Sequence, residues 1–234
     1  TLQRVLDTVD SSRVQFADMR GYQSEDLSLT VKKGKTEDVS SEKLTGVAIR
    51  ALVNGAWGFA SVASFEESKL KETLETAIKM ARGASSHIIT KAEINLDNAF
   101  EGRNEFNPDI NPKDLSFEDK FNLASKVEET LRKHDSRISS YTGRFTEKIQ
   151  RETIVNTLGT NVVSDYGVFR LSGAATARSG NVMQNVANSV ASNSGLKRMV
   201  DWDIDYEMGQ LGDRAIGLLD ADPSPSGRMN VLLE

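Results

Sequence analysis

The stretch from Leu44 to Ser61 constrains the fold more than any other, because it contains a complete hairpin signal. Apolar residues alternate before Asn54-Gly55, and a second apolar run, Ala56-Trp57-Gly58-Phe59-Ala60, follows. Asn-Gly between two such runs is the strongest short-range signal for a β-hairpin, since both turn positions need positive φ. The pattern predicts antiparallel strands at 44–53 and 56–62. Two glycines inside these strands indicate that something else approaches the backbone closely there, and the pattern leaves open what it is.

Alternating and helical patterns in the rest of the chain predict an α+β fold, in which antiparallel sheets pack with long helices. The first half predicts a helix over 1–10, a meander, and a second helix that a Ser64–Glu67 capping box begins and Gly83 ends. The second half repeats this outline, with a helix that Ser116 caps and a second meander. Further predicted strands lie at 14–20, 26–32, 36–41, 138–144, 147–156, 160–166 and 168–178, and a further helix lies at 203–219; 179–197 fits a strand or a helix.

The predicted architecture therefore has two lobes, each of helix-plus-meander type. Leu96 to Lys113 shows little periodicity and several Asn, Gly and Pro residues, which indicates an irregular connection. A clearer linker, Pro223-Ser224-Pro225-Ser226-Gly227, precedes the apolar run Met229–Leu233. The predicted division is an N-terminal lobe at 1–111, a central lobe at 112–222, and a linker with the first strand of a further domain at 223–234. That last run looks cut within a strand, so we expect a piece of a longer protein.

Composition limits the chemistry that the chain can perform. The 234 residues carry a net charge of −5, and the sequence pI is about 5.3. This balance argues against nucleic-acid binding, because phosphate contacts need a basic surface. No apolar run approaches the ~20 residues of a membrane helix, so no membrane partner is expected. Cysteine is absent, which excludes disulfides, thiolate zinc sites and cysteine nucleophiles, and a cytoplasmic location is the default expectation.

Residues of the types that bind metals are few and poorly placed. His87 and His134 are the only histidines, and neither has a histidine partner at helical spacing, so surface positions are the favoured interpretation. Asp201-x-Asp203-x-Asp205 resembles the start of a calcium loop, but the sixth and twelfth loop positions lack the Gly and Glu of an EF-hand. Acidic residues at the start of a helix explain this run better. We therefore predict no metal ligand within the chain.

Nucleophile and nucleotide motifs are also weak or missing. Ser40–Lys43 and Ser194–Lys197 both fit S-x-x-K, but the sequence contains neither K-T-G nor S-D-N, the motifs that accompany S-x-x-K in serine enzymes of that type. The sequence contains no G-x-S-x-G, no phosphate-binding loop and no dinucleotide fingerprint. We predict no catalytic residue, and the residues alone fit a binding module, a regulatory subunit, or part of an enzyme.

Arg50 and Trp57 are the candidates for substrate binding. Arg50 is a charged residue within an apolar strand, beside the strand of Trp57 and Phe59. Its guanidinium suits a peptide carboxylate or carbonyl. Alternatively, its aliphatic stem follows the apolar surface while the charge reaches the rim of the sheet. We predict core packing for Phe59 and leave Trp57 open between core packing and substrate contact.

The block Gly46–Ser61 resembles the N-terminal signature of the TldD/PmbA family, whose old name is modulator of DNA gyrase. Other segments match the family in order: strands like Leu27–Lys32 and Thr36–Ser41, helices like Phe65–Arg82 and Ser116–His134, a strand–turn–strand like Ile149–Asp165, and a linker before a strand like Met229–Leu233. The resemblance covers nearly the whole chain. The form of Ala56–Ser61 is closer to the TldD branch.

The resemblance implies a zinc metallopeptidase that acts on small or unfolded peptides. Such proteins work as homodimers, or as heterodimers of a TldD-like catalytic subunit and a PmbA-like subunit without the metal motif. The family's motif, H-E-x-x-x-H with a further acidic ligand, follows the strand that corresponds to Met229–Leu233, and none of it lies in this sequence. We therefore expect the N-terminal, non-catalytic portion of a TldD-like enzyme, shaping access to the active site. This portion alone should bind no zinc and cleave nothing.

Two other functions fit the same residues. One is a PmbA-like partner subunit, which binds rather than catalyses, and the other is a free-standing protein-interaction module. The encoded sequence after Glu234 discriminates among the three. H-E-x-x-x-H there indicates the enzyme, its absence indicates the partner subunit, and a stop codon indicates the module.

Overall fold

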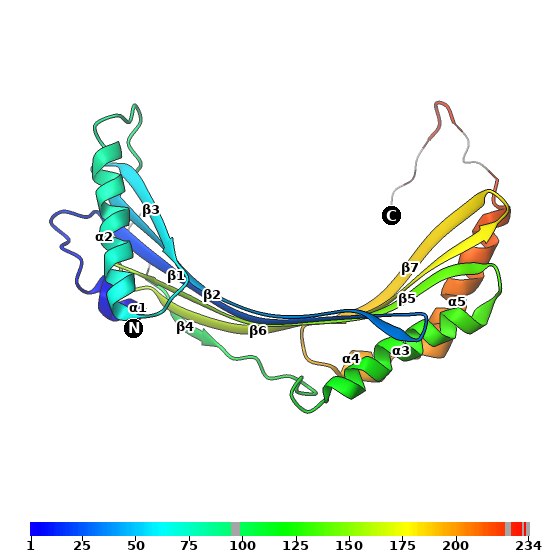
Figure 1. Ribbon diagram of the computed structural model, residues 1–234. Coiled ribbons are helices and arrows are strands. Elements are labelled where there is room, and N and C mark those ends of the chain that lie inside the picture. Colours follow the sequence, from blue (N-terminus) through cyan, green and yellow to red (C-terminus); the bar gives the residue numbers. More distant parts are fainter. Residues whose placement is uncertain (95–98, 223–225, 231, 233–234) are drawn as a thin grey trace.

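One curved β-sheet forms the centre of the molecule. The computed structural model describes residues 1–94, 99–222, 226–230 and 232, and within these residues the sheet has seven strands. Figure 1 shows the sheet as an arch, with helices along its outer, convex side at both ends. The fold is α+β, as the sequence patterns predict.

The strands follow the order β3-β2-β1-β5-β6-β4, and β7 pairs with the same side of β6 as β4, further along the strand. Their bounds are β1 (Phe16–Lys32), β2 (Lys35–Val53), β3 (Ala56–Val62), β4 (Glu101–Asn104), β5 (Ile138–Asn156), β6 (Asn161–Ser179) and β7 (Val182–Ser192). The β4–β6 pair is parallel, and the other pairs are antiparallel. The segment at 179–197, which fits strand or helix by sequence, thus contributes a strand.

The predicted hairpin is confirmed. Asn54 and Gly55 have φ of 51° and 81°, and they join β2 to β3 in a two-residue turn. Gly58 lies where the backbone of a helix packs on β3, since a Cβ there would be 1.9 Å from the carbonyl oxygen of Ala77. At Gly58 the predicted close approach is therefore made by a helix of the chain itself, whereas a Cβ on Gly46 would meet only the Val62 carbonyl oxygen, at 3.4 Å.

The strands are longer than predicted. β1 has 17 residues, and β2, β5 and β6 have 19 each, so the separate short strands of the sequence prediction are wrong. The strands predicted at 160–166 and 168–178 are one strand, and Asp165-Tyr166-Gly167 lies within β6. The two cores lie at the ends of the sheet, and between them polar residues interrupt the alternation of apolar and polar side chains along the strands. All residues from Lys35 to Thr45, for example, are exposed.

The helices are α1 (Leu2–Leu6), α2 (Glu67–Ala84), α3 (Phe117–His134), α4 (Lys197–Val200) and α5 (Ile204–Gly217), with a 3₁₀ turn, η1, at Leu218–Asp220. Ser116 caps α3 as predicted, and it forms a capping box with Asp119. The capping box predicted at Ser64 is wrong, because Glu66 is the N-cap and the Ser64 hydroxyl accepts only from the Glu66 N–H. Gly83 does not end α2 either, since it lacks positive φ and the helix continues past it.

Two hydrophobic cores pack against opposite ends of the sheet. One lies between α1, α2 and the β3 end, and includes Met19, Ile49 and Leu70. The other lies between α3, α5 and the β7 end, and includes Leu131 and Phe145. Both cores lie on the convex side, so the concave side carries no covering helix among the described residues (Figure 1). The lobe boundary at 111 and 112 stays a prediction.

The predicted linker and final strand fall mostly where placement is not described. Residues 223–225, 231 and 233–234 lie outside the described residues, so the linker and the strand at 229–233 stay predictions. Among the helices that are described, none combines the length and apolar character that crossing a membrane requires.

Candidate functional site

Strand pairing arranges the side chains of the concave face in rows that cross the sheet. Met19 and Ile49 point into a core, so their neighbours in sequence point to the concave side. The first row is Phe59, Arg50, Asp18 and Asn156; the second is Ser61, Ala48, Arg20 and Ile154; the third is Gly46, Tyr22 and Glu152. The predicted site residues Arg50 and Trp57 both belong to this face.

Arg50 and Trp57 lie together at the β3 end of the concave face. The guanidinium of Arg50 donates to both carboxylate oxygens of Asp18, with Nε 2.9 Å from Oδ1. This pairing raises the pKa of Arg50. The same guanidinium lies 5.1 Å from the ring centroid of Trp57, whose other edge packs against Phe16. Asp18 is only 4% exposed, so Arg50 neutralises a buried carboxylate as well as supporting the tryptophan.

Phe59 is not in a core, and the prediction of core packing is wrong. Its side chain is 54% exposed and that of Trp57 is 39% exposed. Both alternate along β3 with Ala56, Gly58 and Ala60, which face α2. Because small residues already fill the contact with the helix, the large aromatic residues of this strand face the concave side.

The main-chain edge of β3 is open. In a two-residue hairpin the residues that flank the turn exchange hydrogen bonds, and bonded pairs then alternate along the strands. The N–H and C=O groups of Trp57, Phe59 and Ser61 therefore point away from β2. Within the described residues these groups have no hydrogen-bond partner. An extended chain could add to this edge as a further strand.

The edges of β7 and of the open part of β2 carry protecting groups, which β3 lacks. On β7, Arg214 donates to the Ala187 carbonyl at 2.9 Å and Arg198 to the Ala191 carbonyl at 3.2 Å. The open part of β2 carries many charged side chains: Lys35, Glu37, Asp38, Glu42 and Lys43. Charges and side-chain hydrogen bonds are the usual means by which proteins prevent pairing at strand edges. The sequence Ala56–Val62 contains neither device.

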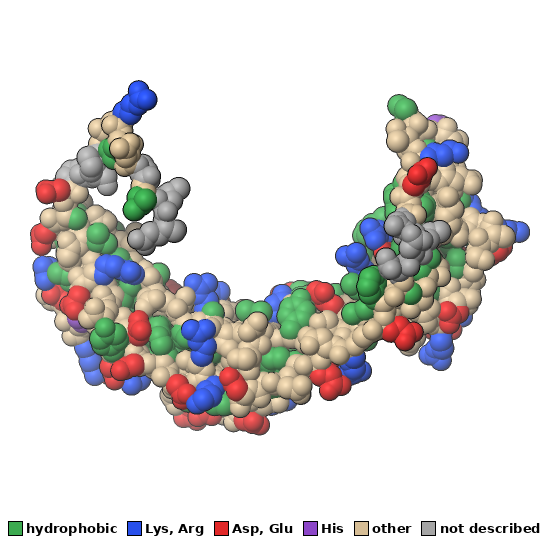
Figure 2. Space-filling view, turned by 180° about the vertical axis from the view of Figure 1, so that it is seen from behind, with side chains coloured by type: hydrophobic (Ala, Val, Ile, Leu, Met, Phe, Trp, Pro, Cys, Tyr) green, Lys and Arg blue, Asp and Glu red, His purple; other side chains and the backbone are tan. Residues whose placement is uncertain are grey.

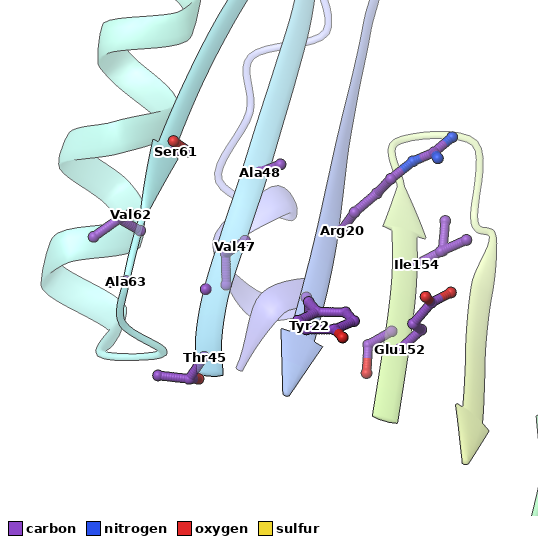
Figure 3. Close-up of a pocket in the computed structure, with 13 residues that line it drawn as sticks. Arg20, Tyr22, Thr45, Val47, Ala48, Ser61, Val62, Ala63, Glu152 and Ile154 are labelled. Carbon is purple, nitrogen blue, oxygen red and sulfur yellow. The ribbon is translucent and has the colours of Figure 1, made fainter. Parts of the chain in front are cut away.

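A shallow hollow of about 550 Å³ lies beside this edge, across the second and third rows. Arg20, Tyr22 and Glu152 line it, with Ala48 and Ser61 on the neighbouring strands. In Figure 3 the side chain of Arg20 extends from β1 across Ile154, on the side away from Ala48 and Ser61. Gly46 and Ala48 form its floor, because neither residue projects far above the sheet. Sequence reasoning missed this site. Its signal is weak, since the residues are spread over four strands whose pairing the sequence does not show.

Polar side chains next to the hollow form a fixed network. The Tyr166 hydroxyl donates to Glu152 at 2.9 Å, and the Gln150 amide donates to the same carboxylate oxygen at 3.2 Å. Burial and the nearby Glu152 carboxylate raise the pKa of Tyr166. Glu152 is therefore held towards β6, away from the edge of β3.

The remaining residues considered for chemistry are explained by local structure. His134 Nε2 lies 2.9 Å from the Asp213 carboxylate, and His87 is exposed after α2. Asp203 caps α5 by accepting from the Tyr206 N–H at 3.1 Å, as expected for acidic residues at a helix start. The described part of the chain contains no group of three or more His, Cys, Asp or Glu side chains placed to hold a metal ion.

Charge on the surface is mixed in sign. Figure 2 shows basic, acidic and hydrophobic side chains distributed along the visible face of the arch, without one continuous basic patch. This face therefore lacks the continuous basic patch typical of nucleic-acid binding.

Comparison with known proteins places this chain in a family of metallopeptidases. Residues 17–81 match the profile of PmbA/TldA metallopeptidase domain 1, and residues 110–219 match the profile of the PmbA/TldA metallopeptidase central domain. The chain therefore belongs to the PmbA/TldD family, as the sequence resemblance implies. The matches do not separate the TldD branch from the PmbA branch.

Individual relatives agree with this assignment. The chain is 26% identical over 223 residues to a metalloprotease of Methanothermobacter thermautotrophicus, covering 95% of this chain and 47% of the relative. It is 23% identical over 238 residues to a metalloprotease TldD homolog of Haemophilus influenzae, covering 100% and 49%. The chain thus spans about half the length of the curated relatives it matches.

Solved structures share the fold. A candidate modulator of a DNA gyrase from Thermotoga maritima superposes with a TM-score of 0.74 at 20% identity, covering 96% of this chain and 49% of that one. TldE from Thermococcus kodakarensis gives a TM-score of 0.65 at 18% identity, with 94% and 46% covered. The relatives' names imply a metal in the family, but the described residues do not fit a metal centre, and we assign no reaction step to one.

Proposed function

We propose that this chain is the non-catalytic, peptide-guiding portion of a TldD-like metallopeptidase that processes small or unfolded peptides. The open edge of β3 is the observation that carries the proposal. Main-chain hydrogen bonds at such an edge accept any extended sequence, whereas most strands of a folded protein are already paired. Family membership supports the hydrolytic reaction, and the edge supports the preference for unfolded substrates.

Trp57 and Phe59 give the edge its apolar contact surface. Side chains of an added strand alternate between the two faces of the sheet, so every second one would lie on the concave side beside these aromatic rings. The contacts of Trp57 with Arg50 and Phe16 fix its ring in one orientation. Arg50 therefore acts as a positioning residue, because its charge is already paired with Asp18.

The proposal also covers the metal, the assembly and the location of the intact protein. Zinc is the metal we propose for the intact protein, held by residues beyond those described. A homodimer, or a heterodimer of TldD and PmbA type, is the proposed assembly, and the cytoplasm is the proposed location. Nucleic acid and membrane are not proposed as partners.

The test uses the full-length protein and a short, unstructured peptide as substrate. Trp57→Ala should raise KM roughly tenfold and leave kcat near its wild-type value, because one aromatic contact to the bound strand is lost. Phe117→Ala is the matched control, since Phe117 is another exposed aromatic residue, on α3. Thermal melting should be similar for all of these proteins.

N-methylated peptides test the main-chain pairing separately. Methylation of alternate amides, those that face β3, should weaken binding, whereas methylation of the intervening amides should not. Equal effects at all positions would contradict strand addition. Loss of folding in Trp57→Ala, or an equal rise of KM in Phe117→Ala, would assign Trp57 to structure instead.

A further inference from the structure

The hollow beside β3 exists because small residues meet in adjacent rows of the sheet. Gly46 and Ala48 on β2 pair with Tyr22 and Arg20 on β1, whose side chains stand much higher. Ile154 and Glu152 continue these rows on β5. The result is a floor of main chain and methyl groups beside a wall of longer side chains, with about 550 Å³ of space (Figure 3). This volume is within the range of pockets that bind small molecules.

Arg20 is the charged group of this hollow that has no partner of its own. It is exposed, and no carboxylate of the described residues forms an ion pair with it. Asp18, its neighbour on the same face, is bound on both oxygens by Arg50. Glu152 accepts from Tyr166 and Gln150. Both donors to Glu152 reach its Oε1, and neither Asp18 nor Glu152 forms an ion pair with Arg20. The guanidinium of Arg20 is therefore available to a ligand.

The charges around the hollow favour one kind of anion. A guanidinium binds a carboxylate through two parallel hydrogen bonds. Glu152 lies diagonally from Arg20, two residue pairs further along the strands, and its negative charge would repel a dianion. A ligand with a single carboxylate therefore fits better than a phosphate or a polyanion. The apolar parts of Ala48 and Ile154 suit a small aliphatic group beside that carboxylate.

We propose that the hollow binds the C-terminal carboxylate of a short peptide, with Arg20 as the carboxylate-binding residue. This inference rests on the proposed function, because it supposes that peptides reach the concave face. The hollow reaches Ser61 at the open edge of β3, so a peptide that leaves this edge can place its C-terminus at Arg20. The site would then distinguish peptide ends from the interior of a longer chain.

Binding to the full-length protein, after chelation of its metal to prevent cleavage, tests the proposal. Isothermal titration compares acetyl-Ala-Ala-Ala with a free C-terminus against the same peptide with a C-terminal amide. The free acid should bind on the order of tenfold more tightly, as expected for a hydrogen-bonded charge pair. Arg20→Gln should abolish this preference, and Arg20→Lys should retain part of it.

Arg144→Gln is the matched control. Arg144 is another exposed arginine on the concave side, and it donates to the Ser28 hydroxyl at 3.0 Å, far from the hollow. Its replacement should leave the preference for the free acid unchanged. A third peptide, acetyl-Ala-Glu-Ala amide, separates a terminal carboxylate from an acidic side chain, and it should bind as weakly as the alanine amide.

The outcomes separate this inference from the proposed function. Equal binding of acid and amide, or an equal loss in Arg144→Gln, overturns the carboxylate site even if the holoenzyme cleaves peptides. Tight binding of the glutamate-containing amide overturns the assignment to the C-terminus. If the holoenzyme cleaves no peptide while the preference persists and depends on Arg20, the proposed function fails and the binding site stands.

Discussion

Two glycines near α2 illustrate how strongly the surroundings of one residue decide its role. A Cβ on Gly58 would lie 1.9 Å from the carbonyl oxygen of Ala77 and 2.5 Å from the N–H nitrogen of Ala81. Both are backbone atoms of the helix, so they cannot rotate away. A Cβ on Gly83, within α2 itself, would have no neighbouring atom within 4 Å. The same substitution should therefore have opposite effects at these two positions.

Gly58→Ala is expected to destabilise the protein by about 1–3 kcal/mol, because α2 must move away from β3 to admit the methyl group. Gly83→Ala is expected to stabilise it by about 0.5–1 kcal/mol, because alanine has the higher helix propensity. Urea unfolding followed by circular dichroism measures both. Equal changes in the free energy of unfolding would show that helix packing on β3 does not require a glycine.

For single residues, the sequence predicts local backbone conformation better than it predicts which distant residues a side chain contacts. Asn54-Gly55 was sufficient to predict the hairpin, because the turn depends only on the backbone preferences of adjacent residues. Arg50 was recognisable as unusual, but its partner Asp18 is 32 residues away and becomes its neighbour only through the register of β1 and β2. Arg20 was missed for the same reason. Contacts across strands depend on register, and register is a property of the folded sheet.

Among the elements, β7 shows how an edge strand can be protected without charges in the strand. Val182–Ser192 contains no charged residue, and long uncharged edges invite pairing with other chains. The carbonyl groups of Ala187 and Ala191 instead accept from Arg214 and Arg198, on α5 and α4. Helices on the convex side thus supply donors that block part of the β7 edge.

Replacing both Arg198 and Arg214 with alanine should promote self-association through β7, because two outward carbonyls lose their donors. Light scattering after gel filtration measures the change, and the fraction of dimer or larger species should rise with concentration. Arg178→Ala is the control, since Arg178 donates to the Gly180 carbonyl in the turn rather than at the edge. A monomer in the double variant, or equal association in the control, would contradict this account.

The lengths of the strands were the main part of the fold that the sequence did not indicate. Gln23, Ser24 and Glu25 interrupt the alternation of β1 where the strand passes from one core to the other. A short-range pattern reads such a polar run as a loop. Pairing with β2 and β5 on both sides keeps it extended, and that pairing involves residues far away in sequence.

The whole molecule consists of two cores joined by a shared sheet. Leu131 lies in the core at the α3 and α5 end, and Leu70 lies in the core at the α1 and α2 end. β1 contributes residues to both cores, with Met19 in one and Leu29 in the other. Between the cores the described residues place polar side chains on both faces of β1 and β2, so few apolar contacts couple the ends.

In such an architecture each end of the sheet should unfold locally without the other, because local unfolding follows the distribution of buried apolar contacts. Leu131→Ala should cost about 2–5 kcal/mol at its own core. Hydrogen exchange followed by mass spectrometry should then show lower protection in α3 and α5, with α2 and β3 close to wild type. Leu70→Ala should give the reverse pattern, which makes each variant the control for the other. Equal loss of protection at both ends in either variant would mean that the long strands couple the two cores into one cooperative unit. In that case a ligand bound at the β3 edge would affect the stability of the whole concave surface.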